Sequence, residues 1–301
     1  MTGLSERAFA KVNLCLFLGG RRPEGRHELV TLFESVSLAD ELTLELAPDA
    51  AADEVVCPGV QAPNLVATAL GALRARGWSA PPVRLQVHKR VPVAAGMGGG
   101  SADAAATLRL AAQVAAVAPS VVAEIAAGLG ADVPSQLDPG PSLGTGAGDI
   151  VESVAKLGDH AVLVLPQPFP LSTAEVYREA DRLGLARAAP QLASLQVSLR
   201  LALTAPDREP AVLPERLIVN DLEPASLSLR PEIGDALEQA RDAGADQAIV
   251  CGSGPTVIGL FWGGGGLVRA GAAAERLRPR FPGAVAVDVV DRGVPAWTAN
   301  G

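Results

Sequence analysis

Aromatic residues and cysteines are both scarce in this sequence of 301 residues. Phe, Trp and Tyr together make up 3 % of the chain, so aliphatic side chains must fill most of any core. The three cysteines, Cys15, Cys57 and Cys251, lie far apart and form no CxxC pair. This pattern disfavours both a disulfide framework and a zinc site, and it predicts a cytoplasmic protein with reduced thiols.

The sequence also lacks an excess of basic residues. Its net charge is −8 and its isoelectric point is near 5.0, which disfavours a surface for nucleic acid or for anionic membranes. The N-terminus has no basic segment followed by a sustained apolar run, so we expect no signal peptide. Residues 247–268 carry no charge, but clustered glycines interrupt them. They predict two buried strands around tight turns rather than a membrane span.

Aliphatic residues are abundant, because hydrophobic residues make up 49 % of the chain and charged residues only 19 %. The length and this composition suit two domains with a substantial core. Polar and apolar residues alternate over 7–18, which predicts a strand with Lys11 and Asn13 on one face. The N-terminal half further predicts strands at 30–36, 41–46 and 83–87, and a helix at 64–76 that ends at Gly77.

The organisation changes after Gly148. A buried strand is expected at 161–165, then a loop entering a helix near 172–177, and then a Pro- and Leu-rich stretch to about 214. The remainder predicts helices at 232–243 and 267–277 and strands at 247–251, 256–262 and 284–290. This alternation of hairpins and helices favours an α+β fold. We place a domain boundary near 155–160, which gives domains at 1–157 and 158–301.

The segment from Val91 to Ala111, VPVAAGMGGGSADAAATLRLA, combines a glycine-rich loop with the start of an alanine-rich helix. Backbone N–H groups of such a loop can converge on an anion because no Cβ blocks the approach. The helix N-terminus adds unpaired donors and the positive end of its dipole. We expect the helix to begin at Ser101, whose hydroxyl caps it or faces a phosphate or Mg²⁺. A branched side chain at Gly99 is expected to obstruct the phosphate.

Two common nucleotide-binding motifs are excluded for this loop. A Walker A loop needs a lysine after the glycines, and Gly-Ser-Ala stands there instead. A dinucleotide-binding fingerprint needs a glycine at a spacing that this loop lacks, followed by a parallel strand with an acidic ribose ligand. A tight turn between a strand and a helix would explain one glycine, but it explains four glycines and a serine less well.

The loop resembles the phosphate-binding motif of the GHMP kinases, in which a proline precedes a Gly-Leu-Gly-Ser-Ser-Ala-Ala pattern. Residues 251–261, CGSGPTVIGLF, resemble the third motif of that family, a glycine turn that lies against the phosphate loop. Four more blocks resemble the members that phosphorylate a cytidyl-linked methylerythritol: AKVNLCLFLGGRRPEGRHEL near the N-terminus, GADVP at 130–134, STAEVY at 172–177 and NDLEPAS at 220–226.

The resemblance implies a two-domain GHMP kinase fold, with an N-terminal ribosomal S5-like βαβ domain and a C-terminal ferredoxin-like domain. It implies transfer of the ATP γ-phosphate to the 2-hydroxyl of 4-diphosphocytidyl-2-C-methyl-D-erythritol, a step of non-mevalonate isoprenoid synthesis, with ATP and Mg²⁺ as cofactors. We expect a monomer or weak homodimer without nucleic-acid or membrane partners. Homoserine kinase is an alternative within the family, and an RNA-binding module is an alternative outside it.

The family's site residues map onto this sequence as follows. By resemblance, Asp132 accepts the proton of the substrate hydroxyl, and Lys11 keeps Asp132 ionised. The nucleotide phosphates would be wrapped by the loop residues Pro92, Val93, Ala94, Ala95, Gly96, Met97, Gly98, Gly99, Gly100, Ser101 and Ala102. Ser101 would also lie near Mg²⁺. Asp103 has two open alternatives, because it either faces away from the phosphates or helps to hold the metal.

The acceptor end is expected to contain six residues: Asn13, Arg26, His27, Tyr177, Gly252 and Ser253. His27 matches a histidine that contacts the base, and Tyr177, the only tyrosine of the chain, matches an aromatic residue on the base's other face. Arg26 departs from the family, which has an aromatic residue there. A guanidinium plane can also stack on a base. For Asn13, Tyr177 and Asp132, purely structural roles in strand, helix packing and turn are the competing interpretations.

Overall fold

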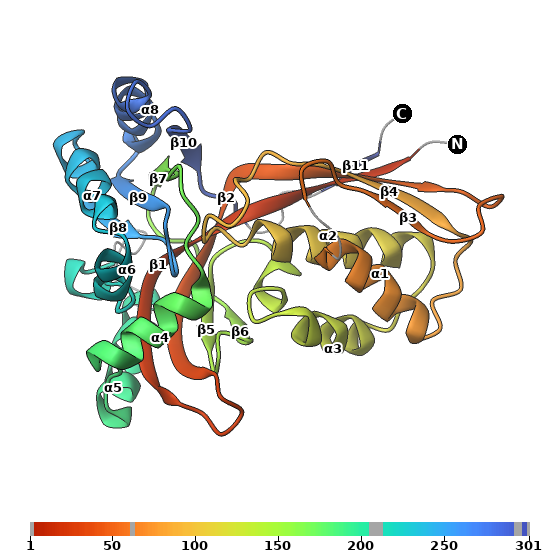
Figure 1. The fold of residues 1–301 in the computed structure, drawn as a ribbon, viewed down its shortest axis with the longest axis horizontal. Coiled ribbons are helices and arrows are strands. Elements are labelled where there is room, and N and C mark those ends of the chain that lie inside the picture. The colour runs from red at the N-terminus through yellow and green to blue at the C-terminus, as the bar shows by residue number, and fades with distance from the viewer. Residues whose placement is uncertain (1–2, 61–63, 205–212, 292–296, 300–301) are drawn as a thin grey trace.

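The computed structural model describes residues 3–60, 64–204, 213–291 and 297–299. Two antiparallel-rich sheets, each covered by helices on one side, lie next to each other (Figure 1). This is the predicted α+β class, since helices and strands form layers rather than a doubly wound parallel sheet. Within the described ranges, we find no helix that combines the length and apolar character needed to cross a membrane.

The larger sheet is built on two long strands, β1 (Leu4–Arg21) and β2 (His27–Leu46), which pair antiparallel. Its strand order is β11-β1-β2-β4-β3, and β5 extends it from β2 and pairs with β6. The remaining strands are β3 (Glu54–Val56), β4 (Val83–His88), β5 (Ser142–Thr145), β6 (Ile150–Ser153) and β11 (Trp297–Ala299). The two strands expected at 30–36 and 41–46 are one continuous β2, because a bulge opposite residues 9–11 absorbs the irregularity between them.

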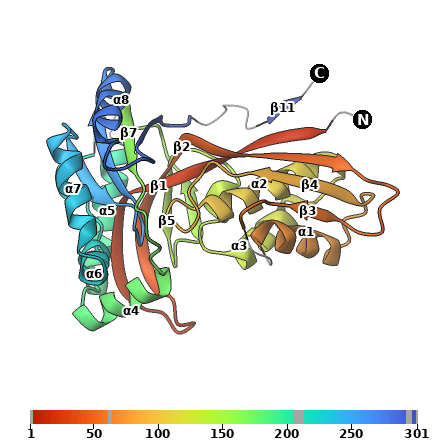
Figure 2. The same cartoon turned by 45° about the horizontal axis from the view of Figure 1, so that its top comes forward.

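Strand β3, helix α1 (Leu65–Ala75) and strand β4 form a parallel βαβ unit. Asn64 begins α1 by accepting a hydrogen bond from the Ala67 N–H, and Gly77 (φ +81°) follows its end as predicted. Helices α1, α2 (Gly99–Val114) and α3 (Pro119–Leu129) lie on one side of the larger sheet (Figures 1 and 2). Helix α2 is largely buried, which accounts for its alanine-rich sequence, because small side chains let it approach its neighbours closely.

The smaller sheet has the strand order β10-β7-β9-β8 with all neighbours antiparallel, which is the predicted ferredoxin-like arrangement. Its strands are β7 (His160–Leu165), β8 (Gln247–Val250), β9 (Val257–Trp262) and β10 (Val285–Asp288). Both faces of β7 are buried. Ala161, Leu163 and Leu165 pack with helices α7 (Glu232–Asp242) and α8 (Gly266–Leu277), while Val162 and Val164 pack towards the larger sheet.

Strand β1 contributes to the cores of both halves. Leu14, Cys15 and Phe17 pack in one cluster with Val162 and Ile258 of the smaller sheet. Helix α5 (Ala189–Thr204) covers the same region, with Leu192 and Leu199 buried in that cluster. This helix was not predicted, because its few apolar anchors are interspersed with exposed Val197 and Leu201 and give only a weak helical period.

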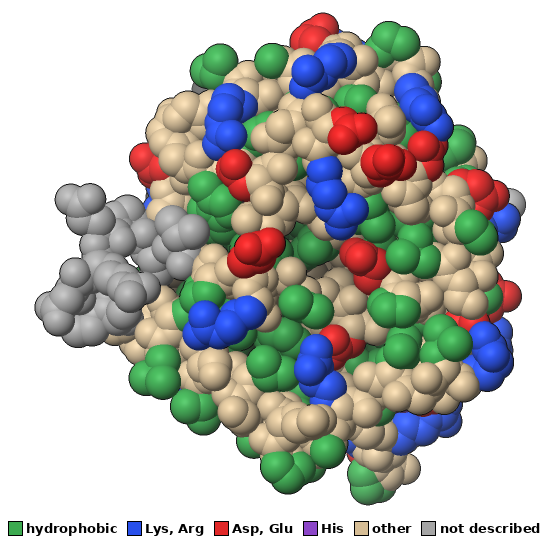
Figure 3. All heavy atoms as spheres, turned by 90° about the vertical axis from the view of Figure 1, so that its left-hand side faces the viewer, with side chains coloured by type: hydrophobic (Ala, Val, Ile, Leu, Met, Phe, Trp, Pro, Cys, Tyr) green, Lys and Arg blue, Asp and Glu red, His purple; other side chains and the backbone are tan. Residues whose placement is uncertain are grey.

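The other helical segments connect these layers. They are η1 (Pro134–Gln136), α4 (Thr173–Leu183), η2 (Glu215–Leu217) and α6 (Glu223–Leu229). Helix α4 confirms the predicted loop-to-helix transition at 172–177. Figure 3 shows the face of the molecule that carries α7 and α8, where cationic and acidic side chains are interspersed. Several are ion-paired there, including Arg280 with Asp235 and Arg269 with Asp246.

Candidate functional site

A cavity of about 1010 Å³ lies where the two halves meet. Its walls come from the ends and bulges of β1 and β2, the glycine-rich loop, the first turn of α2, the Asp132 loop and the start of α4. The volume is at the upper end for small-molecule pockets, so it suits two ligands rather than one. Although the chain is acidic, five cationic and two acidic side chains line the cavity: Lys11, Arg21, Arg26, Lys89 and Arg178, and Asp103 and Asp132.

The glycine-rich loop owes its path to residues with positive φ. Ala94, Gly96 and Gly98 have φ values of +55°, +76° and +66°, and such angles favour glycine. A Cβ built on Gly96 would lie 2.6 Å from the Cys251 carbonyl oxygen and 2.8 Å from that of Gly254. The loop therefore packs directly against the turn at 251–254, backbone on backbone. This is the contact expected between the phosphate-binding loop and the third motif.

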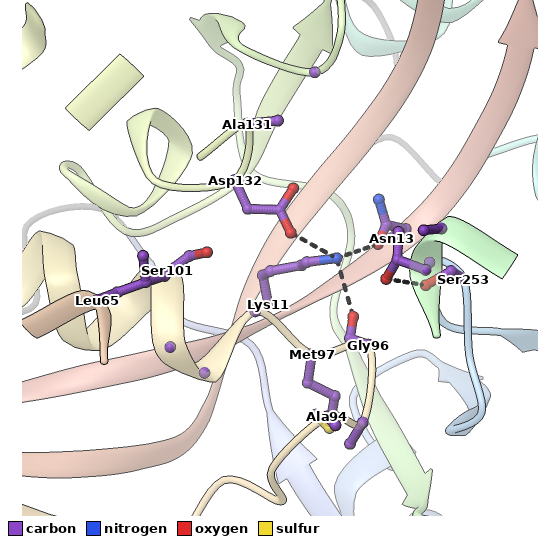
Figure 4. A pocket seen from close by; sticks show the side chains of 18 of the residues that line it. Lys11, Asn13, Leu65, Ala94, Gly96, Met97, Ser101, Ala131, Asp132 and Ser253 are labelled. Atoms are coloured by element: carbon purple, nitrogen blue, oxygen red, sulfur yellow. Dashed lines mark hydrogen bonds and ion pairs between the residues drawn. The ribbon is translucent and has the colours of Figure 1, made fainter. Parts of the chain in front are cut away.

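Helix α2 begins at Gly99 rather than at the predicted Ser101. Gly98, in the left-handed region, occupies the N-cap position, and its carbonyl accepts the Ala102 N–H at 2.8 Å. Ser101 is thus a first-turn residue that lines the cavity (Figure 4), and its expected role as helix cap is wrong. The first N–H groups of an α-helix have no partner within it, so the start of α2 offers donors to an anion.

Gly99 packs closely against the residues that follow the end of β4. A Cβ at this position would lie 3.0 Å from Val91 Cγ1 and 3.5 Å from Lys89 Nζ. The glycine permits close packing of the helix start on these two residues. Gly99 also lines the cavity, and the expected obstruction of a phosphate by a branched side chain here stays a prediction.

Lys11 lies in the middle of β1, with only 4 % of its surface exposed. Its Nζ donates to Asn13 Oδ1 at 2.7 Å and to the Gly96 carbonyl at 3.0 Å, and it lies 3.5 Å from Asp132 Oδ2 (Figure 4). Asn13 is itself fixed, because its Nδ2 donates to Thr31 Oγ1 at 2.8 Å. These contacts hold a buried ammonium group between the glycine loop and a carboxylate.

Asp132 follows α3 in the loop that leads into η1. Its side chain is 35 % exposed, so one carboxylate oxygen faces Lys11 while the group stays accessible from the cavity. The Ser135 hydroxyl donates to the Asp132 carbonyl at 2.8 Å and stabilises the turn that carries it. An accessible carboxylate beside a fixed ammonium is an arrangement able to accept a proton from a bound hydroxyl.

A second cluster of charges lies beside the start of α2. Lys89 Nζ donates to Asp103 Oδ2 at 2.7 Å and also to Asp40. Burial, reinforced by the Asp40 carboxyl, raises the pKa of Asp103 to about 7 against the opposing effect of Lys89. Asp103 lines the cavity and its carboxyl accepts a hydrogen bond from Lys89, and both alternatives for its role stay predictions.

The opposite end of the cavity contains His27, Tyr177 and Arg26. The rings of His27 and Tyr177 lie 5.1 Å apart with a 34° tilt. His27 Nε2 lies 2.8 Å from Asp181 Oδ1, and Arg26 Nη2 lies 3.4 Å from Asp149 Oδ2. In the nearby turn, the Ser253 hydroxyl is within 2.9 Å of Thr173 Oγ1, which ties the third glycine motif to α4.

The cavity brings together nearly all of the predicted site residues. Ala102 is the exception, because it is buried in the helix and does not line the cavity. Sequence reasoning missed Lys89, which lines the cavity, and the carboxylates Asp40 and Asp181, which bond to Lys89 and His27. Lys89 could have been found from the sequence, because it is one of three lysines in an arginine-rich chain. Asp181 could have been found too, because it lies four residues after Tyr177 and therefore on the same helix face.

The sequence matches two family profiles. The profile of the GHMP kinases N terminal domain matches residues 64–140, and that of the GHMP kinases C terminal domain matches residues 208–280. The chain is 39 % identical to the 4-diphosphocytidyl-2-C-methyl-D-erythritol kinase of Streptomyces coelicolor, over 95 % of this chain and 98 % of that protein. It is 38 % identical to the enzyme of the same name from Pseudarthrobacter chlorophenolicus, over 93 % and 91 % of the two chains.

Solved structures agree with the sequence comparisons. A crystal structure of 4-(cytidine 5'-diphospho)-2C-methyl-D-erythritol kinase superposes with a TM-score of 0.73 at 31 % identity, covering 95 % of this chain and 99 % of that one. Homoserine kinase from Cytophaga hutchinsonii reaches the same TM-score at 17 % identity, over 99 % and 97 % of the chains, and so shares the fold. The chain therefore belongs to the 4-diphosphocytidyl-2-C-methyl-D-erythritol kinases of the GHMP kinase family.

Proposed function

We propose that the protein transfers the γ-phosphate of ATP to the 2-hydroxyl of 4-diphosphocytidyl-2-C-methyl-D-erythritol in the non-mevalonate isoprenoid pathway. One observation carries this proposal: the Lys11–Asp132 pair lies between a backbone-lined anion cradle and an end built from His27 and Tyr177. Relatives at 38–39 % identity over nearly the whole chain carry the name of this kinase. The cavity accordingly has room and chemistry for a nucleotide at one end and a nucleotide-linked alcohol at the other.

Asp132 acts as the base of the reaction. Its carboxylate takes the proton of the substrate hydroxyl while that oxygen forms a bond to the γ-phosphorus, and the bond from phosphorus to the bridging oxygen breaks to release ADP. Lys11 stabilises the ionised form of Asp132 and offsets charge that develops on the transferred group. Because Lys11 is held by Asn13 and Gly96, it supplies this charge without reorganising.

The loop from Pro92 to Ser101 and the first turn of α2 bind the ATP phosphates through backbone N–H groups. The residues present fit a magnesium ion that arrives with the nucleotide. Such an ion keeps phosphate and water ligands and needs only one or two protein oxygens, and Ser101 lines the cavity in the first turn of α2. When bound, the ion would neutralise phosphate charge.

His27, Tyr177 and Arg26 bind the cytosine end of the acceptor, while Asn13, Gly252 and Ser253 lie towards its hydroxyl groups. We also propose that the enzyme works in the cytoplasm as a monomer or weak homodimer, and sedimentation at micromolar concentration tests the latter. Homoserine kinase activity is the second candidate, but its support is a shared fold at 17 % identity. The residues at the His27 end have no purpose for so small an acceptor.

The decisive experiment offers the purified protein ATP with each acceptor and follows ADP formation. We expect turnover with the cytidyl-linked alcohol and background rates with homoserine. ADP formation with homoserine alone would replace the proposed function by the second candidate. Salt-sensitive binding of RNA without any ATP turnover would replace it by an RNA-binding function.

A further inference from the structure

His27 is held at the acceptor end by contacts on two sides. It opens β2, its surface is only 5 % exposed, and it lines the cavity. The Tyr177 ring packs against its ring at a centroid distance of 5.1 Å. Its Nε2 lies 2.8 Å from Asp181 Oδ1 on α4. Within the described residues, the imidazole makes no second hydrogen bond. Nδ1 is therefore the ring nitrogen that remains for a ligand.

Asp181 is in turn held by Arg21. The Nε and Nη2 atoms of Arg21 donate to Asp181 Oδ2 at 3.0 and 2.5 Å. Arg21 ends β1 and stands opposite His27 in the β1–β2 ladder, so the two partners of Asp181 are neighbours in the sheet. Partial burial opposes ionisation of Asp181, but the hydrogen bonds from Arg21 and His27 outweigh it and lower the pKa of this carboxyl. The group facing Nε2 is therefore a carboxylate.

A carboxylate only accepts hydrogen bonds, so His27 must donate to it through Nε2–H. In a neutral imidazole the second nitrogen then carries no proton and is an acceptor. Nδ1 consequently carries the lone pair, and because His27 lines the cavity, we infer that this lone pair accepts from a donor on the ligand. Cytosine has an exocyclic amino group on its pairing edge, whereas uracil has a carbonyl at the same position.

We propose that Asp181 is a positioning residue that fixes the His27 tautomer and thereby selects an acceptor with an amino-bearing pyrimidine over a uracil analogue. This inference rests on the proposed function, in which His27 contacts the base. Asp181 acts through His27 and does not touch the substrate. Without the carboxylate, the ring proton is free to move to Nδ1, and Nδ1–H then donates to a carbonyl where the Nδ1 lone pair had accepted from the amino group.

The test compares kcat/KM for the cytidyl-linked acceptor with kcat/KM for its uridyl-linked analogue. We expect Asp181→Ala to lower this ratio by roughly tenfold or more, because a buried mismatch of donors and acceptors is costly. Asp181→Asn has a single carbonyl oxygen, which the two donors of Arg21 occupy, so its NH2 group faces Nε2 and favours the Nδ1–H form. The ratio should therefore fall in this variant as well, although a side chain of the same size is retained. Glu179→Ala is the matched control on the same helix, since Glu179 pairs with Arg182 and Ser228 rather than with His27.

A ratio that is unchanged in Asp181→Ala, or equally lowered in Glu179→Ala, would overturn the inference. If Asp181→Ala does not fold, ¹⁵N spectra of the wild-type protein decide the matter, because the chain has only three histidines. The Nε2–H form of His27 is expected, and the Nδ1–H form would refute it. A wild-type protein that uses neither acceptor would instead refute the proposed function, so the two failures are distinguishable.

Discussion

The two ends of the cavity are built from different parts of the polypeptide. At the nucleotide end, the loop around Gly96 and Gly98 and the first turn of α2 present main-chain groups. At the proposed acceptor end, the side chains of His27, Tyr177 and Arg26 line the cavity, and Asp181 and Asp149 bond to two of them. Ligand binding by main-chain groups depends on the conformation of the loop. Ligand binding by side chains depends on which residues occupy the positions.

The homoserine kinase neighbour shows that the fold persists at 17 % identity. A cradle of main-chain groups needs little more than glycines at a few positions. The acceptor end is free to change with the side chains. Substitutions at the two ends should therefore have different effects on the kinetic constants and on the free energy of unfolding.

Asp132→Ala removes the carboxylate that lies between the two ends. We expect kcat to fall by about 10³-fold, because a positioned base contributes on the order of 10²–10⁴ to the rate. ATP binding, measured by calorimetry, should change little since the cradle is mainly backbone. The exposed Asp49→Ala serves as the matched control and should leave kcat unchanged. Near-full turnover of Asp132→Ala would contradict the assignment of the base.

Gly96→Ala tests the backbone character of the nucleotide end. The new Cβ would meet two carbonyl oxygens at 2.6 and 2.8 Å, at a φ of +76°. We expect a loss of about 2 kcal/mol or more in the free energy of unfolding, together with weaker ATP binding. Gly100→Ala is the control, because its Cβ meets only Leu65 at 3.7 Å and alanine favours a helix. Equal stability of both variants in urea unfolding would argue against the packed turn.

Asp103→Asn tests the side-chain cluster at the nucleotide end. The folded-state pKa of Asp103 is about 7, above its ordinary value of 3.8, so the folded protein binds more protons here between those two pH values. Its contribution to stability therefore falls as the pH rises through this window. From pH 5 to pH 8, the wild type should lose roughly 1–2 kcal/mol more than Asp103→Asn in urea unfolding. Parallel pH profiles of the two proteins would refute this.

Arg26→Tyr tests the acceptor end, and we expect it to have the smallest effect of these variants. Arg26 is half exposed and pairs with Asp149 at 3.4 Å, so its loss should cost little stability. A tyrosine ring restores the aromatic surface typical of the family, and base–aromatic stacking is worth about 1–3 kcal/mol. We expect the acceptor KM to fall several-fold with the ATP KM unchanged. An increase in acceptor KM would mean that the guanidinium makes a better contact than the ring.

Much of the nucleotide end was predictable from the sequence because its signals are local. Four glycines, an incoming strand and an alanine-rich helix occur within one continuous segment. The exact start of α2 was not predictable, because a glycine in the left-handed region capped it in place of a serine. The long helix α5 was missed for the related reason that tertiary contacts of Leu192 and Leu199, rather than a strong period, stabilise it.

The partners at the acceptor end come from distant parts of the chain, so the sequence could not pair them. His27 and Asp181 are separated by 154 positions, and Arg26 and Asp149 by 123. Lys89 was conspicuous by composition, but its bonds to Asp40 and Asp103 depend on how β4 and α2 meet. Long-range pairs of this kind follow from topology, which local patterns do not encode.

Strand β1 passes through both halves of the molecule, and Leu14, Cys15 and Phe17 cover one face of the smaller sheet. A protein cut between residues 157 and 158 would therefore leave the C-terminal fragment with bare aliphatic residues such as Val162 and Ile258 exposed to water. Such a fragment should aggregate when produced alone and dissolve when co-expressed with the N-terminal piece. We therefore expect each half to depend on the other for folding.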